Sequence, residues 1–337
     1  MEAYLLNNYT KCPPTTLLES NEFQVIIFRT LSIITFPSFV YGVYLILYVT
    51  PESMKNVKNT LMFVHICTFI FDAIVNCLVQ PYFLLPTTAL YLNGILWVYL
   101  GLPFHFICWI AQYSMYCLGM SIIYLFQSRH SMIITVKYRM TKTSTKIIYY
   151  TVGYFVGAIG MASYHFQDFD DEEVKLQFLQ TVYPCPPIEY FDKNTFVVTN
   201  NMMVIVVGQC IVIFYAFAHA IFWIFSSVYQ LTKKTAKISK HTREMQLKFL
   251  KAVSIQISVP LLAIMCPGTG MTIMIAASQK SQLMNNIIIS ACGLHGLMSN
   301  LCLIFVQRAY RDFTFRCFNR NRMFSKVSIV IIHTDVL

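Results

Sequence analysis

The sequence predicts an all-α membrane protein, a bundle of seven transmembrane helices with its N-terminus outside the cell and its C-terminus in the cytoplasm. Of the 337 residues, 56% are hydrophobic and only 12% are charged, whereas a globular domain carries about 25% charged residues. The 56 residues between Asp72 and Arg129 contain no acidic residue, lysine or arginine, so they cannot form the surface of a soluble protein. The apolar runs are long, whereas a transmembrane β-barrel shows short segments of alternating polarity.

The chain opens with a polar arm, residues 1–24, which is predicted to be extracellular. This arm has no short apolar stretch behind basic residues, so we expect no cleaved signal peptide, and the first span serves as its own insertion signal. Asn8 begins an Asn-Tyr-Thr sequon, which predicts glycosylation because the arm is exported.

Seven apolar stretches follow within residues 25–307, the predicted transmembrane bundle, and residues 308–337 form the predicted cytoplasmic tail. A helix needs about 20 apolar residues to cross ~30 Å of hydrocarbon. The fifth stretch is longer than this and is expected to continue as helix into the cytoplasm. An apolar loop is expected between the second and third spans. The predicted spans are approximately 25–49, 59–80, 100–126, 147–164, one within 196–231, 247–277 and 283–306.

The distribution of lysine and arginine sets the predicted orientation. With the N-terminus outside, 20 of the 25 basic residues fall on cytoplasmic segments and five on the outer side, which is the asymmetry that membrane proteins show. Five acidic residues gather in one outer loop, within residues 168–173. The net charge of +10 therefore reflects membrane sidedness, and we expect a lipid bilayer and no nucleic acid as the partner of this charge.

The cysteines divide by location. Eight of the eleven lie inside apolar spans, where they behave as small hydrophobic residues. Only Cys12 and Cys185 lie in polar segments of the predicted outer side, where disulfides form, so we expect these two to pair. The paired spacing typical of metal sites is missing, and we expect no metal and no cofactor.

Several sequence blocks succeed one another in a specific order. The approach to the second span reads TPESMKNVKNTLMFVH and leads to Asp72 and PYFLLP, and the third span runs from GLPF to SIIYLFQSR. The second outer loop carries DDEEVKLQFLQTVYPCPP, and the last two spans read MQLKFLKAVSIQISVPLLAIMCPG and QLMNNIIISACGLHGLMSN, followed by RAYRDF. From Ile33 to Phe313, this succession resembles the nematode serpentine chemoreceptors of class H, a family of seven-helix chemosensory receptors.

The chain departs from the pattern of that family at three places. Residues 127–129, Gln-Ser-Arg, stand where the family usually has a Glu-Asn-Arg-like end to the third span. Residues 295–300 read HGLMSN in place of a His-Gly-x-x-Ser-Thr pattern, and residues 309–311 read Ala-Tyr-Arg in place of Pro-Tyr-Arg. The missing acid beside Arg129 removes a charge partner that could hold an inactive state.

The resemblance implies a chemosensory G-protein-coupled receptor, not an enzyme. Such a receptor binds a small odorant or soluble cue within the helix bundle and activates a heterotrimeric G protein. It would be a multi-pass protein of the plasma membrane, in a sensory cilium. A membrane transporter or ligand-gated channel is the alternative, and would show inverted repeats or several charges inside the spans. An intramembrane enzyme would need paired carboxylates or His/Asp sets in the bilayer.

A ligand site is predicted in the outer half of the third span. Four polar or aromatic residues recur there at spacings that place them on one helical face: His105, Trp109, Gln112 and Tyr116. This face either lines an apolar pocket with a few polar groups or packs against another helix, with Gln112 as an interhelical hydrogen-bond donor.

A coupling site is predicted where the third span meets the cytoplasm. Arg129 either contacts the sixth span or a G protein, as the resemblance implies, or is an anchor of the kind that marks cytoplasmic segments. A basic run between the fifth and sixth spans is expected to face lipid headgroups, to dock a G-protein helix, or to do both. The members singled out are Lys233, Lys234, Lys237 and Arg243.

Asp72 lies ~20 Å inside the bilayer, at 1.5 Å per helical residue. Intramembrane acids mark functional sites or polar networks. The predicted partners are a sodium ion or residues of the last span; the alternative is a protonated acid with one hydrogen bond. The candidates in the last span are His295, Ser299 and Asn300.

Two prolines, Pro260 and Pro267, are expected to break the sixth span, because proline removes a helical hydrogen bond. In a receptor this kink would be the hinge about which the cytoplasmic half swings, although kinks are also ordinary features of membrane helices. The resemblance also implies an alternative disulfide, between Cys108 in the third span and Cys185 in the second outer loop.

Overall fold

The computed structural model describes residues 16–133, 143–165, 170–181, 186–232 and 240–316. Some side chains within these ranges, including those of Arg129, Arg243 and Pro260, lie outside the description although their backbone is helical.

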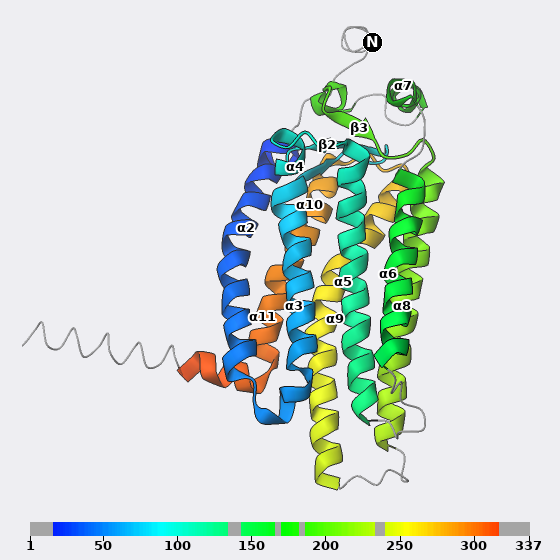
Figure 1. Ribbon diagram of the computed structural model, residues 1–337. Coiled ribbons are helices and arrows are strands. Elements are labelled where there is room, and N and C mark those ends of the chain that lie inside the picture. The colour runs from blue at the N-terminus through cyan, green and yellow to red at the C-terminus, as the bar shows by residue number, and fades with distance from the viewer. Residues whose placement is uncertain (1–15, 134–142, 166–169, 182–185, 233–239, 317–337) are drawn as a thin grey trace, which may run out of the picture.

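Seven helical rods stand side by side in the described chain, and the last rod consists of two helices (Figure 1). Each rod contains the centre of one predicted span. A π-helical turn extends α2 through Leu45–Val49, and another extends α3 through Ile74–Val79. The helices of the rods are α2 (Asn21–Tyr44), α3 (Lys55–Ala73), α5 (Phe104–Ile133), α6 (Thr143–His165), α8 (Met202–Thr232), α9 (Lys240–Ala276), α10 (Gln282–Gly293) and α11 (His295–Val306).

Length and composition alone identify part of this bundle as membrane-spanning. Among the described residues, three helical segments are long and apolar enough to cross a bilayer: Asn21–Val49, Lys58–Val79 and Phe104–Ser128. The pair α10 and α11 passes the same test together, and the two helices meet at a bend of 41°.

A short sheet closes one end of the bundle. Strands β1 (Pro81–Phe83), β2 (Ala89–Leu92) and β3 (Thr195–Val197) pair antiparallel in that order, with Tyr82 opposite Tyr91 and Leu90 opposite Phe196. The segment between the second and third spans was expected to be an apolar loop, and the strands correct that expectation. We call this end of the bundle the sheet end (Figure 1).

The remaining short elements lie at the two ends of the bundle. At the sheet end, α7 and the 3-10 helix of 188–191 sit over the sheet, and we call these elements and the sheet together the cap (Figure 1). At the opposite end, which we call the tail end, residues 308–316 form a further helical segment. The short helices are the 3-10 turns Leu17–Glu19 and Glu52–Met54, α4 (Ile95–Val98), α7 (Asp171–Thr181) and the 3-10 helix Ile188–Phe191.

Two serines fix the start of helices at the sheet end. The hydroxyl of Ser20 accepts a hydrogen bond from the backbone N–H of Phe23 at the start of α2, and Ser281 does the same for Met284 at the start of α10. Such side chains satisfy N–H groups that the first turn of a helix leaves without a partner.

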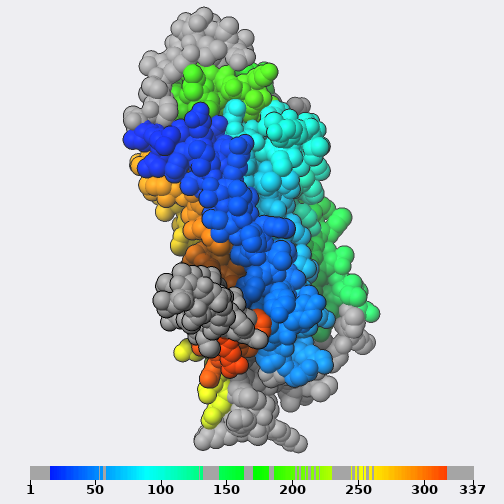
Figure 2. All heavy atoms as spheres, turned by 90° about the vertical axis from the view of Figure 1, so that its left-hand side faces the viewer, coloured from blue at the N-terminus to red at the C-terminus, as the bar shows by residue number. Residues whose placement is uncertain are grey.

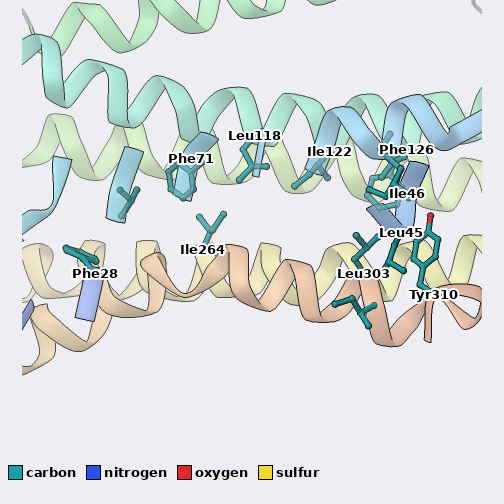
Figure 3. Packing of buried hydrophobic residues seen from close by; sticks show 14 of the residues in the cluster. Phe28, Leu45, Ile46, Phe71, Leu118, Ile122, Phe126, Ile264, Leu303 and Tyr310 are labelled. Carbon is teal, nitrogen blue, oxygen red and sulfur yellow. The ribbon is translucent and has the colours of Figure 1, made fainter. Parts of the chain in front are cut away.

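The core runs along the axis of the bundle. One cluster of buried apolar side chains joins five rods and extends toward the tail end (Figure 3). It includes Phe28 of α2, Phe71 of α3, Leu118 of α5, Ile264 of α9 and Leu303 of α11.

The surface of the bundle is apolar, as a surface in contact with lipid requires. Ile33 on α2 is 73% exposed, Phe155 on α6 is 66% exposed and Phe214 on α8 is 76% exposed. Polar side chains such as Asp72 and Asn300 are buried instead. In the space-filling view, α2 and α3 run down one side of the bundle and the cap lies across its top (Figure 2). Polar groups face the interior because lipid offers them no hydrogen bonds.

The sixth span is one continuous helix, and a different rod is interrupted. α9 is one helix from Lys240 to Ala276 and continues past both Pro260 and Pro267, so the expectation that these prolines interrupt the span is wrong. Membrane helices tolerate proline because neighbouring groups can satisfy the freed carbonyl. The interrupted rod is the last one, where α10 ends at Gly293 and α11 begins at His295.

Candidate functional site

A cavity of about 180 Å³ lies inside the bundle beneath the cap. Its walls come from α3, α5, α9 and α10, and Phe83, Leu90 and Val198 of the cap form part of its roof. Among the side chains described as lining it, none is charged and Gln112 is the one amide. We call this space the interior cavity.

A second, larger hollow lies on the other side of α5. It is a cleft of about 1210 Å³, lined by residues of α5, α6 and α8. Gln112 and Met115 of α5 line both this cleft and the interior cavity. The two hollows are therefore neighbours, and α5 separates them.

The predicted ligand-binding face of α5 meets α6 for most of its length. Trp109 Nε1 donates a hydrogen bond of 3.0 Å to the carbonyl of Ala158, and the Tyr116 hydroxyl donates one of 3.0 Å to the carbonyl of Gly153. These contacts correspond to the helix-packing alternative. Of the four residues singled out on this face, Gln112 alone is among the described residues that line the interior cavity.

The cap above the interior cavity carries acidic groups in partly buried positions. Burial raises the pKa of Asp171 in α7, although Lys175 and the nearby His105 of α5 lower it in part. Burial likewise raises the pKa of Glu189. His105 thus lies where α5 meets the cap, close to an acid that the sequence did not connect with it.

A buried contact between an aspartate and a histidine joins α3 to the start of α11. His295 Nδ1 lies 2.8 Å from Asp72 Oδ1, and the two side chains are 1% and 3% exposed. The backbone N–H of Gly296 donates to the same Asp72 oxygen at 3.2 Å. His295 was among the predicted partners of Asp72, and the structure places it there.

The other predicted partners of Asp72 lie further along α11. Asn300 Nδ2 donates a hydrogen bond of 2.7 Å to the Ser38 hydroxyl of α2, and Ser299 is half-buried. Asn300 thus ties α11 to α2, whereas the two groups that contact Asp72 belong to the first two residues of α11.

Asn76 is a member of this site that the sequence did not reveal. Its Nδ2 donates a hydrogen bond of 2.9 Å to the carbonyl of Gly293, the last residue of α10. Asp72 and Asn76 are one helical turn apart on α3, so one face of α3 binds both sides of the break between α10 and α11. The spacing of four from Asp72 was the available signal.

The tail end of α5 is held by hydrogen bonds to two neighbouring helices. The Tyr150 hydroxyl of α6 donates to Gln127 Oε1 at 2.7 Å, and His130 Nε2 lies 2.7 Å from the Ser226 hydroxyl of α8. Gln127 is therefore buried as a neutral hydrogen-bond acceptor. Arg129 lies between these two contacts in the chain, and its side chain is outside the description.

Several predicted site residues fall outside the described residues. They are Asn8, Cys12, Cys185, Lys233, Lys234 and Lys237, together with the side chain of Arg243. Cys108, the alternative partner of Cys185, is a buried free thiol. Across the described residues, no group of three or more His, Cys, Asp or Glu side chains could hold a metal ion.

Comparison with known proteins places the chain among chemoreceptors. A family model described as the serpentine-type 7TM GPCR chemoreceptor Srh matches residues 19–320. Serpentine receptor class H-72 of Caenorhabditis elegans is 25% identical over 326 residues, which is 96% of this chain and 92% of that relative.

Proposed function

The chain belongs to the serpentine seven-transmembrane chemoreceptor family Srh, and on that premise we propose that it detects a small molecule in its interior cavity and activates a heterotrimeric G protein. The family is one of multi-pass membrane receptors and not of enzymes, and ligands and G proteins are its general partners. The resemblance noted in the sequence is thereby confirmed.

The observation that carries the proposal is the interior cavity. Its volume of about 180 Å³ is close to that of an engineered apolar cavity of about 150 Å³ that binds benzene. Drug-sized ligands occupy pockets of roughly 300–1,000 Å³. A cavity of this size and apolar lining supports a ligand with few non-hydrogen atoms, such as a volatile odorant.

Two elements connect the cavity to the tail end. Gln112 in the cavity wall and Arg129 lie on the same helix, 17 residues or ~25 Å apart. The cavity is also lined by Ile289 and Cys292 of α10, directly before the break that Asp72 and Asn76 hold. A ligand shifts a receptor between states only through different affinities for them. We propose that the packing at this break changes between those states, with Pro260 and Pro267 of α9 as a second hinge.

The orientation follows from the basic residues. Those of the tail end include Lys55, Lys58 and Lys248, which supports a cytoplasmic tail end and an extracellular cap. On this basis residues 1–24 are extracellular and glycosylated at Asn8, and residues 308–337 are cytoplasmic. An epitope beside Asn8 should react on intact cells, and reaction only after permeabilisation would reverse the orientation.

Two further features of the proposal concern the outer surface and the cell. Cys12 pairs with Cys185 across the outer side, and peptide mapping without reduction should recover that link; a link between Cys108 and Cys185 would contradict it. The receptor acts in the plasma membrane of a sensory cilium, as expected of a chemoreceptor.

The G protein docks at the tail end. Arg129 lies there, flanked by the contacts of Gln127 and His130, and α8 ends and α9 begins at the same end of the bundle. The residues that we assign to G-protein contact are Arg129, Lys233, Lys234, Lys237 and Arg243.

The test is a ligand screen in cells that express the receptor with a calcium or cyclic-nucleotide readout, using small neutral odorants. Gln112→Ala should lower ligand potency and leave surface expression unchanged. Arg129→Ala should leave ligand binding intact and abolish or distort the response. If Arg129→Ala reaches the surface and signals with wild-type amplitude, the arginine is only a topological anchor.

A further inference from the structure

The cleft beside α5 exists because two helices share a neighbour without packing on each other. α6 and α8 both pack along α5, but their backbones come close to one another at few positions, and a side-chain hydrogen bond between Tyr149 and Tyr215 bridges them. The cleft between them runs from Thr145 to Met161 of α6, which is ~24 Å at 1.5 Å per residue. It therefore extends over most of the hydrocarbon thickness of a bilayer.

Glycines shape the two sides of this cleft differently. Gly157 of α6 lets the Tyr116 ring of α5 approach, because a Cβ there would overlap the ring. At Gly160 of α6 and Gly208 of α8, in contrast, an added Cβ would meet no atom within 4 Å. α6 is thus drawn close to α5, while the space toward α8 stays open.

The cleft and the interior cavity share part of their walls. Gln112 and Met115 belong to the walls of both, so only these two described side chains are shared between them. A ligand that passed between α6 and α8 would reach the cavity by displacing one flexible methionine and one amide. Methionine is unbranched and adapts its shape readily.

The extracellular route is closed by comparison. The cap covers the cavity with the sheet, and a second layer packs on the sheet through Tyr82, Leu179, Tyr190 and Phe191, which are all buried. Passage through the described part of the cap would require both layers to separate. Passage from the side requires Gln112 and Met115 of α5, which line both spaces, to move aside.

We propose that the ligand reaches the interior cavity sideways from the lipid bilayer, through the cleft between α6 and α8 and past Gln112 and Met115. This inference rests on the proposed function of the interior cavity. The ligand class that follows is a small, uncharged, lipophilic molecule that dissolves in the membrane before it binds.

The chemistry of the cleft fits this class. No described lining side chain of the cleft or of the cavity is charged. A charged ligand would lose its hydration along this path without gaining a charged partner, which is costly in an apolar environment. A neutral molecule with a single polar group could use Gln112, which contacts both spaces.

The experiment measures how fast a membrane-dissolved probe reaches the cavity. The receptor is reconstituted in lipid nanodiscs and mixed with a small aliphatic diazirine alcohol. A light flash after a set delay converts the probe to a carbene, which inserts into nearby bonds. Peptide mass spectrometry then quantifies labelling at Cys108 and Met271, which line the cavity and not the cleft, and at the exposed Cys266 as a lipid-facing reference.

Two variants obstruct the cleft, and one serves as a matched control. Gly208→Leu and Gly160→Leu fill empty space in the cleft from opposite walls. Ala218→Leu adds a leucine side chain on an exposed part of α8 outside the cleft lining. Each obstructing variant should slow labelling of the cavity at least tenfold, reach the same final labelling at long delay, and leave Cys266 unchanged. Ala218→Leu should label at the wild-type rate.

The outcomes separate this inference from the proposed function. If Gly208→Leu and Gly160→Leu are folded and the cavity is labelled at the wild-type rate, lateral access is wrong, while the receptor proposal stands. If cavity residues stay unlabelled at every delay although the cleft is labelled, the interior cavity is not a ligand site and both ideas fail. A cleft filled by a co-purified phospholipid that blocks the probe would also overturn the inference.

Discussion

The two sides of α5 are built from the same kinds of residue, yet one is closed and the other open. Toward α3 and α9, Leu118, Ile122 and Phe126 are buried in the main core. Toward α6, Trp109 and Tyr116 donate hydrogen bonds to backbone carbonyls, and beside them lies the cleft of about 1210 Å³. Helix contacts in a membrane thus need not exclude lipid, because lipid tails are as apolar as the side chains.

Two glycines, Gly296 and Gly160, show this difference in packing most directly. Gly296 on the closed side has no room for a side chain, because an added Cβ would overlap the carboxylate of Asp72. Gly160 on the open side faces empty space. The same substitution at these two positions therefore measures how closely each side is packed.

The largest effect is expected from Gly296→Ala. The added methyl group must displace Asp72 from His295, so we expect a loss of ~4 kcal/mol in the free energy of unfolding. Gly160→Ala should instead be neutral or stabilise by ~0.5–1 kcal/mol, because alanine is the better helix former. Thermal unfolding of both variants in nanodiscs gives the comparison. Equal melting temperatures would show that the two sides are packed alike.

The contact between Asp72 and His295 gives the second prediction. His295→Ala leaves the Asp72 carboxylate buried without its partner, and we expect a cost of ~3 kcal/mol. Adding Asp72→Asn replaces the buried acid with a neutral amide and should recover part of this loss, so the double variant should be more stable than His295→Ala. A double variant that is less stable by the full sum of the single effects would mean that the two side chains act independently.

The third prediction concerns the contact of α5 with α6. Tyr116→Phe removes the hydroxyl that donates to the Gly153 carbonyl but keeps the ring beside Gly157, and should cost ~1 kcal/mol. Tyr116→Ala should cost more, because it also removes the ring that fills this contact. Melting temperatures of the two variants separate the hydrogen bond from the packing. An unchanged value for Tyr116→Ala would contradict the role of this face in packing.

The sequence predicts the spans and their orientation, but it does not predict which helices pack together. The spans follow from charge-free stretches, and the charge asymmetry follows from lysine and arginine, because lipid constrains both. Spacing alone placed Trp109, Gln112 and Tyr116 on one face, but it does not tell which neighbour that face meets. The packing of α6 on this face depends on Gly153 and Gly157, which lie about 40 residues away in the chain.

The features that the sequence did not predict depend on partners that are distant in the chain, or on the ability of a helix to accommodate proline. The strands of the sheet have three or four residues each, and β3 lies about 100 residues from β2, so no local pattern announces their pairing. Pro260 and Pro267 are strong helix-breaking signals, yet α9 continues through them. The break between α10 and α11 contains no proline and is fixed by Asp72 and Asn76 of another helix.

The smallest effect on stability is expected at the cap, which covers the interior cavity at the sheet end of the bundle. Burial raises the pKa of Glu189 above its ordinary value of 4.5, so the folded cap binds a proton more readily than the unfolded chain does. Cap stability should therefore rise as the pH falls through the raised pKa toward 4.5, and decline above it. Asp171, whose pKa is raised in the same direction, adds to this effect.

Hydrogen exchange in β3, corrected for the intrinsic rate at each pH, measures this change in the cap. Protection should be greater at pH 5 than at pH 7, with the core of α5 as the reference. Glu189→Gln should reduce the difference, because glutamine does not ionise. A pH dependence that is unchanged in Glu189→Gln would assign it to other groups.

The bend between α10 and α11 also gives the last rod a mechanical property. α11 has 12 residues and is therefore ~18 Å long. It would pivot about the bend, where Asp72 and Asn76 bind the backbone of Gly296 and Gly293. A change of ~10° in the bend of 41° would carry the far end of α11 by ~3 Å, given that length. Ile289 and Cys292 lie next to the bend, so a small shift caused by a ligand there would become a larger displacement at the far end of α11, where residues 308–316 begin.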